Sequence, residues 1–374
     1  MEKSVHTQDT GLHADVVAFC PWARALDLLV CATYELRDGV RVGKLLLYSV
    51  RRSKAAALPS LRSEAEFACA GIFDAAWRPP SAGDEEGCLL ALACADGTVQ
   101  VVRASREGAD SPARLDAVAS CELPAAADDA RSFCLAADWA WVRDTAASGP
   151  VAKGATSNLA CCDNAGRAHL VALDGALPRV ITSWKAHDLE IWTASHQRIA
   201  GGLLMTGADD CKLKGWDTRD PKRPVFVNKS HSMGITSIQT DPRAEHVVLT
   251  GSYDEHLRIF DLRMPQREIA SIGLGGGTWC ARWHPFVPGA IVAACMHNGF
   301  QLARASSDHS KLEHLGPCSA PDVGESLGYG ADWSHEHAAD PGVPLLGATC
   351  SFYNHTLHLW TVEQTVFEAR VDAP

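Results

Sequence analysis

Residues 206–219 read TGADDCKLKGWDTR, and 44 positions later residues 250–263 read TGSYDEHLRIFDLR. Each copy holds a short strand, a polar turn, and a second strand that ends on an aromatic residue followed by Asp. A spacing of about 40–45 residues between such copies is typical of four-stranded units arranged around a ring. The pattern therefore predicts a chain of repeated antiparallel β units.

The first copy and the loop before it hold four residues whose side chains can bond to one another in a chain: His187, Thr206, Asp210 and Trp216. This set matches the structural tetrad of a WD40 β-propeller blade, and we expect it to be buried with every polar group paired. In the second copy Phe260 replaces the Trp. We therefore expect that chain to lose its indole donor and to end at Asp254.

Seven units of this kind can be traced along the chain. Their predicted third strands lie near Leu45, Val99, Arg167, Leu213, Leu257, Phe300 and Leu357. The sequence therefore predicts an all-β fold, a seven-bladed WD40 β-propeller that forms a single domain over residues 1–374. We expect an exposed insertion near 143–156 and a polar loop near 306–325. One terminal strand must close the ring. We favour residues 3–10 over residues 363–371, because they precede the first inner strand.

The composition excludes several classes of protein. The chain has a net charge of −11 and no run rich in Lys or Arg, so we expect no nucleic-acid surface. The N-terminus lacks an apolar targeting segment, and the longest apolar runs are too short to span a membrane. The 14 Cys include no CxxC pair, which favours reduced thiols in a cytoplasmic protein.

Chemistry is much less visible than the fold. The sequence has no phosphate-binding loop, Rossmann glycine motif or His-Glu-x-x-His motif. Residues 324–328 (GESLG) match Gly-x-Ser-x-Gly, but they precede a predicted strand, whereas a nucleophile elbow joins a strand to a helix. Most propellers are interaction platforms, and the fold alone does not define an activity. Glu190, Trp192, Asp209 and His297 stand at strand starts or turns where a site could lie. Each of them can equally pack, cap a strand or lie in a solvated turn.

A series of blocks along nearly the whole chain resembles the eukaryotic diphthine methyl esterase family of WD-repeat proteins, whose members are also named diphthine methyltransferases. The blocks include residues 14–21 (ADVVAFCP), 43–49 (GKLLLYS), 183–192 (SWKAHDLEIW), 207–219, 231–234, 250–256, 279–286 (WCARWHPF), 294–300 (ACMHNGF), 329–333 and 350–355. Several blocks lie in turns, where an ordinary repeat would vary. The chain departs from the family at Phe260, where Trp is usual, and at Cys211, where Gly is usual.

The resemblance implies an activity that the fold does not. It implies a carboxylic ester hydrolase that removes the methyl ester of methylated diphthine on elongation factor 2, yielding diphthine for the final amidation step of diphthamide biosynthesis. The alternative is a non-enzymatic WD40 scaffold that recruits diphthamide-pathway enzymes to elongation factor 2. One assay separates the two, because only the hydrolase removes the ester unaided.

The implied reaction suggests roles for particular residues. With no strand-to-helix elbow for a serine, a water activated by His297, Asp209 or Glu190 is the economical nucleophile. The backbone amides of Gly276 and Gly277 could stabilise the oxyanion.

The substrate's trimethylammonium group could rest against Trp192 and Trp279. We expect Met233 beside them, over the central channel, because these residues precede or begin inner strands of three successive blades. His297 and Asp209 lie in turns between second and third strands, which could open on the other face.

We expect neither a cofactor nor a metal. A zinc hydrolase stays as a third possibility, supported only by the 16 His of the chain. Their spacing supplies no tight ligand set.

Overall fold

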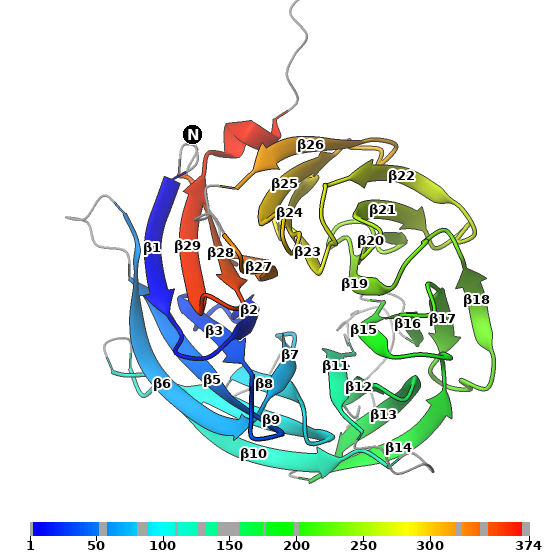
Figure 1. Ribbon diagram of the computed structural model, residues 1–374, viewed down its shortest axis with the longest axis horizontal. Helices are drawn as coiled ribbons and strands as arrows, with labels where there is room; N and C mark the ends of the chain where they lie inside the picture. The colour runs from blue at the N-terminus through cyan, green and yellow to red at the C-terminus, as the bar shows by residue number, and fades with distance from the viewer. Residues whose placement is uncertain are drawn as a thin grey trace, which may run out of the picture.

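The computed structural model describes residues 3–51, 58–80, 88–108, 111–125, 132–140, 157–174, 177–197, 202–318, 324–336 and 343–368. Within these ranges the chain forms seven antiparallel sheets that stand as blades around a central axis (Figure 1). The predicted seven-bladed β-propeller is therefore confirmed. The insertion predicted near 143–156 lies outside the described residues.

Each blade has four strands, ordered from the centre outward. The first blade has β2 (Ala14–Phe19), β3 (Leu28–Thr33), β5 (Val40–Arg51) and β6 (Ser60–Ala70), with β4 (Glu35–Arg37) added beside β5. The second has β7 (Ile72–Trp77), β8 (Cys88–Cys94), β9 (Thr98–Ser105) and β10 (Arg114–Glu122). The third has β11 (Cys134–Trp139), β12 (Ser157–Asp163), β13 (Arg167–Asp174) and β14 (Leu177–Lys185).

The later blades repeat this order. The fourth has β15 (Ile191–His196), β16 (Leu203–Ala208), β17 (Leu213–Asp217) and β18 (Pro224–Asn228). The fifth has β19 (Ile235–Thr240), β20 (Val247–Ser252), β21 (His256–Asp261) and β22 (Glu268–Gly273). The sixth has β23 (Cys280–Trp283), β24 (Ala290–Ala294), β25 (Phe300–Ala305) and β26 (Leu312–Pro317).

The seventh blade closes the ring with strands from both ends of the chain. It contains β27 (Gly328–Trp333), β28 (Leu345–Ser351), β29 (Thr356–Val362) and, outermost, β1 (Lys3–Asp9). β1 runs antiparallel to β29, from Lys3 opposite Thr361 to Asp9 opposite Thr356. The prediction that the N-terminal strand closes the last blade is therefore confirmed. A 3₁₀ turn (Gln364–Phe367) follows β29.

The core lies between neighbouring blades, where seven clusters of buried apolar side chains fill the seven junctions. Tryptophans at the ends of inner strands also bond across three junctions. Trp77 donates its indole N–H to Ala18 O (3.2 Å), and Trp139 donates to Ala76 O (2.8 Å). Trp333 donates to the carbonyl oxygen of Arg282 (3.2 Å). The inner strands are thereby held in fixed relative positions.

One expectation about the outer surface needs correction. The segment 306–325 was predicted as a polar loop, but Leu312–Pro317 forms the outer strand β26 and pairs with β25. Leu312 and Leu315 pack against buried clusters while their neighbours face solvent. An outer strand is polar on one face, so its composition resembles that of a loop.

Among the described residues, none belongs to a helix of the length and apolar character that a membrane span requires.

Candidate functional site

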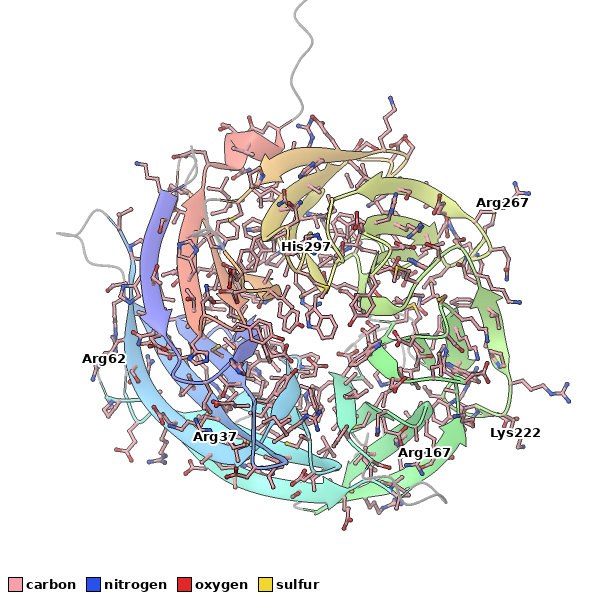
Figure 2. The ribbon with its side chains drawn as sticks, in the orientation of Figure 1. Arg37, Arg62, Arg167, Lys222, Arg267 and His297 are labelled. Atoms are coloured by element: carbon pink, nitrogen blue, oxygen red, sulfur yellow. The ribbon has the colours of Figure 1, made fainter. Side chains whose placement is uncertain are left out.

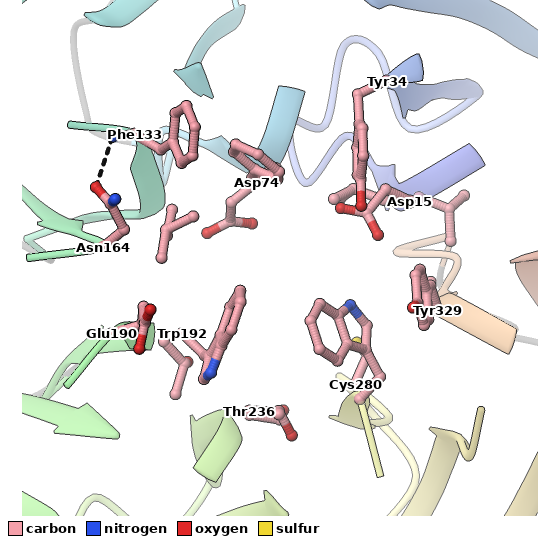
Figure 3. Close-up of a pocket in the computed structure, with 18 of the residues that line it drawn as sticks. Asp15, Tyr34, Asp74, Phe133, Asn164, Glu190, Trp192, Thr236, Cys280 and Tyr329 are labelled. Carbon is pink, nitrogen blue, oxygen red and sulfur yellow. Dashed lines mark hydrogen bonds between the residues drawn. The ribbon is translucent and has the colours of Figure 1, made fainter. Parts of the chain in front are cut away.

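A cavity of about 380 Å³ occupies the mouth of the central channel where the inner strands begin (Figure 3). Residues from all seven blades line it. A cavity of this size falls within the usual range of small-molecule sites, and its lining combines aromatic side chains with charged and polar ones. This cavity is the candidate functional site.

The inner strands build the cavity wall with a shared irregularity. In six blades the pairing of the inner strand shifts at its second residue, which leaves an extra residue there. The extra residues are Asp15, Phe73, Leu135, Trp192, Thr236 and Tyr329. In the sixth blade Trp279 directly precedes β23. A β-bulge re-aims the side chain of its extra residue, and all seven side chains line the cavity.

Four aromatic residues form one side of the cavity, which we call the aromatic wall: Trp192, Tyr253, Trp279 and Tyr329. Trp279 lies at its centre. Its ring is 4.7 Å from Tyr329 in a stacked arrangement, 5.5 Å from Trp192 and 5.8 Å from Tyr253. Such a surface can bind apolar groups and also cations, which are attracted to the faces of aromatic rings.

Two carboxyl groups turn toward the centre of the ring, from Asp15 and Asp74 (Figure 3). Burial raises the pKa of Asp15 well above its ordinary value, and the charge of Asp74 raises it further. Asp15 is 2% exposed, and its Oδ1 atom has no hydrogen-bond partner among the described residues. Both effects favour the protonated form of Asp15.

Asp74 is held differently. It accepts the N–H of Ala75 at Oδ1 (2.9 Å) and the N–H of Ala137 at Oδ2 (3.0 Å). Burial raises the pKa of Asp74 above its ordinary value, although the hydrogen bond from Ala137 and the positive charge of Arg282 offset part of that rise. Two neighbouring carboxyl groups with unequal surroundings are a common arrangement for an acid and a base.

Side chains that could act as direct nucleophiles are present but not activated. Burial raises the pKa of the Cys280 thiol, which donates to Ala331 O at 3.6 Å. The Ser237 hydroxyl donates to Ala281 O (3.4 Å) and accepts the Ala281 N–H (3.1 Å). In the part of the chain that the structure describes, neither group is hydrogen-bonded to a histidine. The cavity is therefore better suited to activating a water than to covalent catalysis.

The structure brings several of the predicted site residues together. Glu190, Trp192 and Trp279 all line the cavity. Asp209 lies just behind the wall, where its Oδ1 accepts the indole N–H of Trp192 at 2.9 Å. Met233 is outside the lining, on the same face, with 51% of its surface exposed.

The other predicted residues lie outside the cavity lining. His297 is in the turn between β24 and β25 and is exposed (Figure 2). Gly276 and Gly277 are buried under this turn. A Cβ on Gly276 would meet Cys295 O at 2.3 Å, and one on Gly277 would meet Met296 Sδ at 2.8 Å. Close packing against the turn accounts for these glycines.

The predicted tetrad is connected throughout in the structure. His187 bonds Asp210 Oδ1 through Nδ1 (2.8 Å) and Thr206 Oγ1 through Nε2 (2.8 Å), and Trp216 donates its indole N–H to Thr206 (2.9 Å). Burial lowers the pKa of His187, which keeps the ring neutral at neutral pH. His187 precedes β15, whereas Asp210 lies between β16 and β17. Turns between second and third strands therefore open on the same face as the starts of the inner strands.

The corresponding chain in the fifth blade has no indole donor and still ends at Asp254, as predicted, but it includes a residue that was not expected. Thr250 still bonds His231 Nε2 at 3.1 Å. Arg258, which is 8% exposed, lies between His231 Nδ1 (3.0 Å) and Asp254 (2.8 and 2.9 Å). A guanidinium provides donors for both partners, so Arg258 links His231 to Asp254 within the chain.

Many residues that line the cavity were not predicted from the sequence. They include Asp15, Tyr34, Asp74, Tyr253, Cys280, Arg282 and Tyr329. Asp15 and Tyr329 share a recurring position, the second residue of an inner strand, which could have signalled them. The other five do not share this position.

Fold and cavity together define a WD-repeat β-propeller with a candidate ligand site at one mouth of its channel. The family model for the WD domain, G-beta repeat, matches residues 222–261. A chain in the solved structure titled "Crystal Structure of Mitotic Checkpoint Complex" superposes with a TM-score of 0.65. It is 14% identical and covers 96% of this chain and 95% of its own, and this likeness shows the fold alone.

Similar sequences are more specific. The diphthine methyltransferase of Homo sapiens is 32% identical over 88% of this chain and 74% of its own length. That of Mus musculus is 34% identical over 87% and 68%, and that of Schizosaccharomyces pombe is 27% identical over 95% and 96%. The chain belongs to the diphthine methyltransferase family. Within the described ranges, no group of three or more His, Cys, Asp or Glu side chains is placed to hold a metal ion.

Proposed function

We propose that this protein hydrolyses the methyl ester of methylated diphthine on elongation factor 2, in the cavity at the channel mouth. Family membership implies a methyl-modifying enzyme of diphthamide biosynthesis, and ester hydrolysis is the particular reaction that we propose. The product, diphthine, would carry the free carboxylate that the final amidation step consumes. We place this reaction in the cytoplasm, where elongation factor 2 works.

The observation that carries this proposal is the combination of an aromatic wall with a pair of carboxyl groups in one cavity. Methylated diphthine bears a trimethylammonium group and a methyl ester on one side chain. The faces of Trp192 and Trp279 suit the cation, which is attracted to aromatic rings. Glu190 in the cavity lining and Asp209 behind the aromatic wall add negative charge near Trp192.

The carboxyl pair suits the ester. In our proposal Asp74 accepts a proton from a water whose oxygen bonds to the ester carbonyl carbon. Protonated Asp15 donates a hydrogen bond to the carbonyl oxygen as negative charge develops there. The bond from that carbon to the methoxy oxygen then breaks, and the methoxy group leaves as methanol with the proton taken by Asp74. The products are methanol and a carboxylic acid, which ionises in water.

The test is to incubate the purified protein with methylated elongation factor 2, without any methyl donor, and to follow the factor by intact mass. Hydrolysis predicts loss of one methyl mass by the protein alone. A scaffold predicts binding of the factor with ester loss only when another pathway enzyme is added. A gain of methyl mass on addition of a donor would favour methyl transfer over hydrolysis.

A further inference from the structure

Between its second and third strands the first blade carries an extension. Among the described residues, the other blades have only a short turn at this place. In the second and fifth blades the turn between second and third strands takes only residues 95–97 and 253–255. In the first blade the chain continues from β3 into β4, turns, and returns along the start of β5. We call this hairpin, residues 35–42, the arm.

The arm is a well-formed hairpin. Its turn residues, Asp38 and Gly39, have φ values of 49° and 79°. Positive φ at both central residues is the signature of a two-residue type I′ turn, whose twist matches that of the flanking strands. Glu35 and Arg37 also form an ion pair at 3.0 Å. A hairpin already ordered in the free protein loses little conformational entropy when it binds a partner.

The base of the arm is part of the cavity. Tyr34, just before β4, and Arg41, on its return strand, both line the cavity. The Arg41 guanidinium lies 4.7 Å from the centroid of Phe133, another lining residue. The arm therefore starts at the mouth and extends the face on which a ligand enters.

The two sides of the arm differ in direction. Leu36 pairs with Arg41, and Arg37 pairs with Val40. Residues directly opposite each other in an antiparallel pair point to the same side, so Leu36 shares the cavity side with Arg41. Val40 points to the other side. Leu36 and Val40 are both highly exposed for apolar side chains, at 59% and 53%.

We propose that the arm docks the protein substrate: Leu36 packs against the surface of the folded protein whose modified side chain enters the cavity. This inference rests on the proposed function. A side chain can reach the cavity floor only if the protein that bears it rests on this face. Three further exposed apolar residues lie on the same face: Leu189 before Glu190, Met233 near Tyr253, and Tyr353. Tyr353 packs against Phe352, which in turn contacts Tyr329 of the aromatic wall. Apolar side chains at the rim of a site are typical of a protein-binding surface.

The test compares two substrates and two matched variants. The substrates are folded methylated elongation factor 2 and a short peptide bearing the same modified histidine. The variants are Leu36→Ser and Val40→Ser, which remove similar exposed side chains from opposite sides of one hairpin. Thermal unfolding checks that both variants stay folded.

Docking by the Leu36 side predicts that Leu36→Ser raises KM for the folded factor about tenfold, the effect of losing one well-packed contact. KM for the peptide and kcat for both substrates should not change. Val40→Ser should leave every constant near the wild-type value.

Three outcomes would overturn the inference while leaving the proposed function in place. These are an unchanged KM for the factor in Leu36→Ser, an equal rise for peptide and factor, or an equal effect of Val40→Ser. Failure of the wild-type protein to hydrolyse either substrate would instead overturn the proposed function.

Discussion

Replacing Trp279 tests the assigned role of the aromatic wall. Trp279 lies between Trp192, Tyr253 and Tyr329, with ring centroids 4.7–5.8 Å away. A cation held against a Trp face away from water gains about 2 kcal/mol. Trp279→Leu keeps an apolar side chain but removes the ring, so the account predicts a loss of affinity of about 30-fold.

The assay measures binding of two peptides that differ in one group. One carries the trimethylammonium of methylated diphthine, and the other carries a neutral tert-butyl group of the same shape. Trp279→Leu should weaken the cationic peptide about 30-fold and the neutral peptide much less. Trp184→Leu, which removes a half-buried Trp from β14 outside the cavity, serves as the control. Equal losses for the two peptides would show that the wall supplies only apolar packing, and our reasoning about the cation would fail.

Three further predictions concern the carboxyl pair, the tetrad and acid. Asp74→Asn removes the proposed general base and should lower kcat at least about 100-fold with the fold retained, as steady-state kinetics and melting curves would show; near-normal turnover would assign the base elsewhere. Thr206→Val leaves the Nε2 atom of His187 and the indole N–H of Trp216 without their partner. Chemical denaturation should therefore show a free energy of unfolding lower by about 3 kcal/mol. A decrease below about 1 kcal/mol would mean that the surrounding structure relaxes to pair these groups again. Burial lowers the pKa of His196 to about 4, below the ordinary value near 6.5, so the unfolded chain binds a proton first as pH falls. Stability should therefore decline from about pH 6.5 toward pH 4, by about 3 kcal/mol for this residue, and His196→Phe should show a flatter profile; identical profiles would contradict the assignment.

The parts that were predictable from sequence are those set by local pattern. The tetrad could be predicted because Thr206, Asp210 and Trp216 occur within one repeat at fixed spacing, and buried polar groups require partners. The ring of seven blades follows from counting such repeats. Closure by β1 follows from chain order, since residues 3–9 precede the first inner strand.

The cavity was harder to predict because it is assembled from single residues far apart in sequence. Asp15 is the extra residue of the bulge in β2, whereas Asp74 directly follows the extra residue Phe73 in β7, and only the folded ring brings both into one cavity. His297 was predicted as a site residue because it is a histidine in a turn where a site could lie. The direction of a side chain at a turn depends on backbone angles that sequence does not fix: Met296 has a φ of 47°, and His297 is exposed outside the cavity.

The central claim is that water cleaves the ester at its carbonyl carbon in this cavity. The most direct measurement is to run the reaction in water labelled with heavy oxygen and to determine, by mass spectrometry, where the label goes. The account predicts one heavy oxygen in the new carboxylate of elongation factor 2 and unlabelled methanol. Label in the methanol, or a factor that keeps its methyl group in the presence of this protein alone, would contradict it.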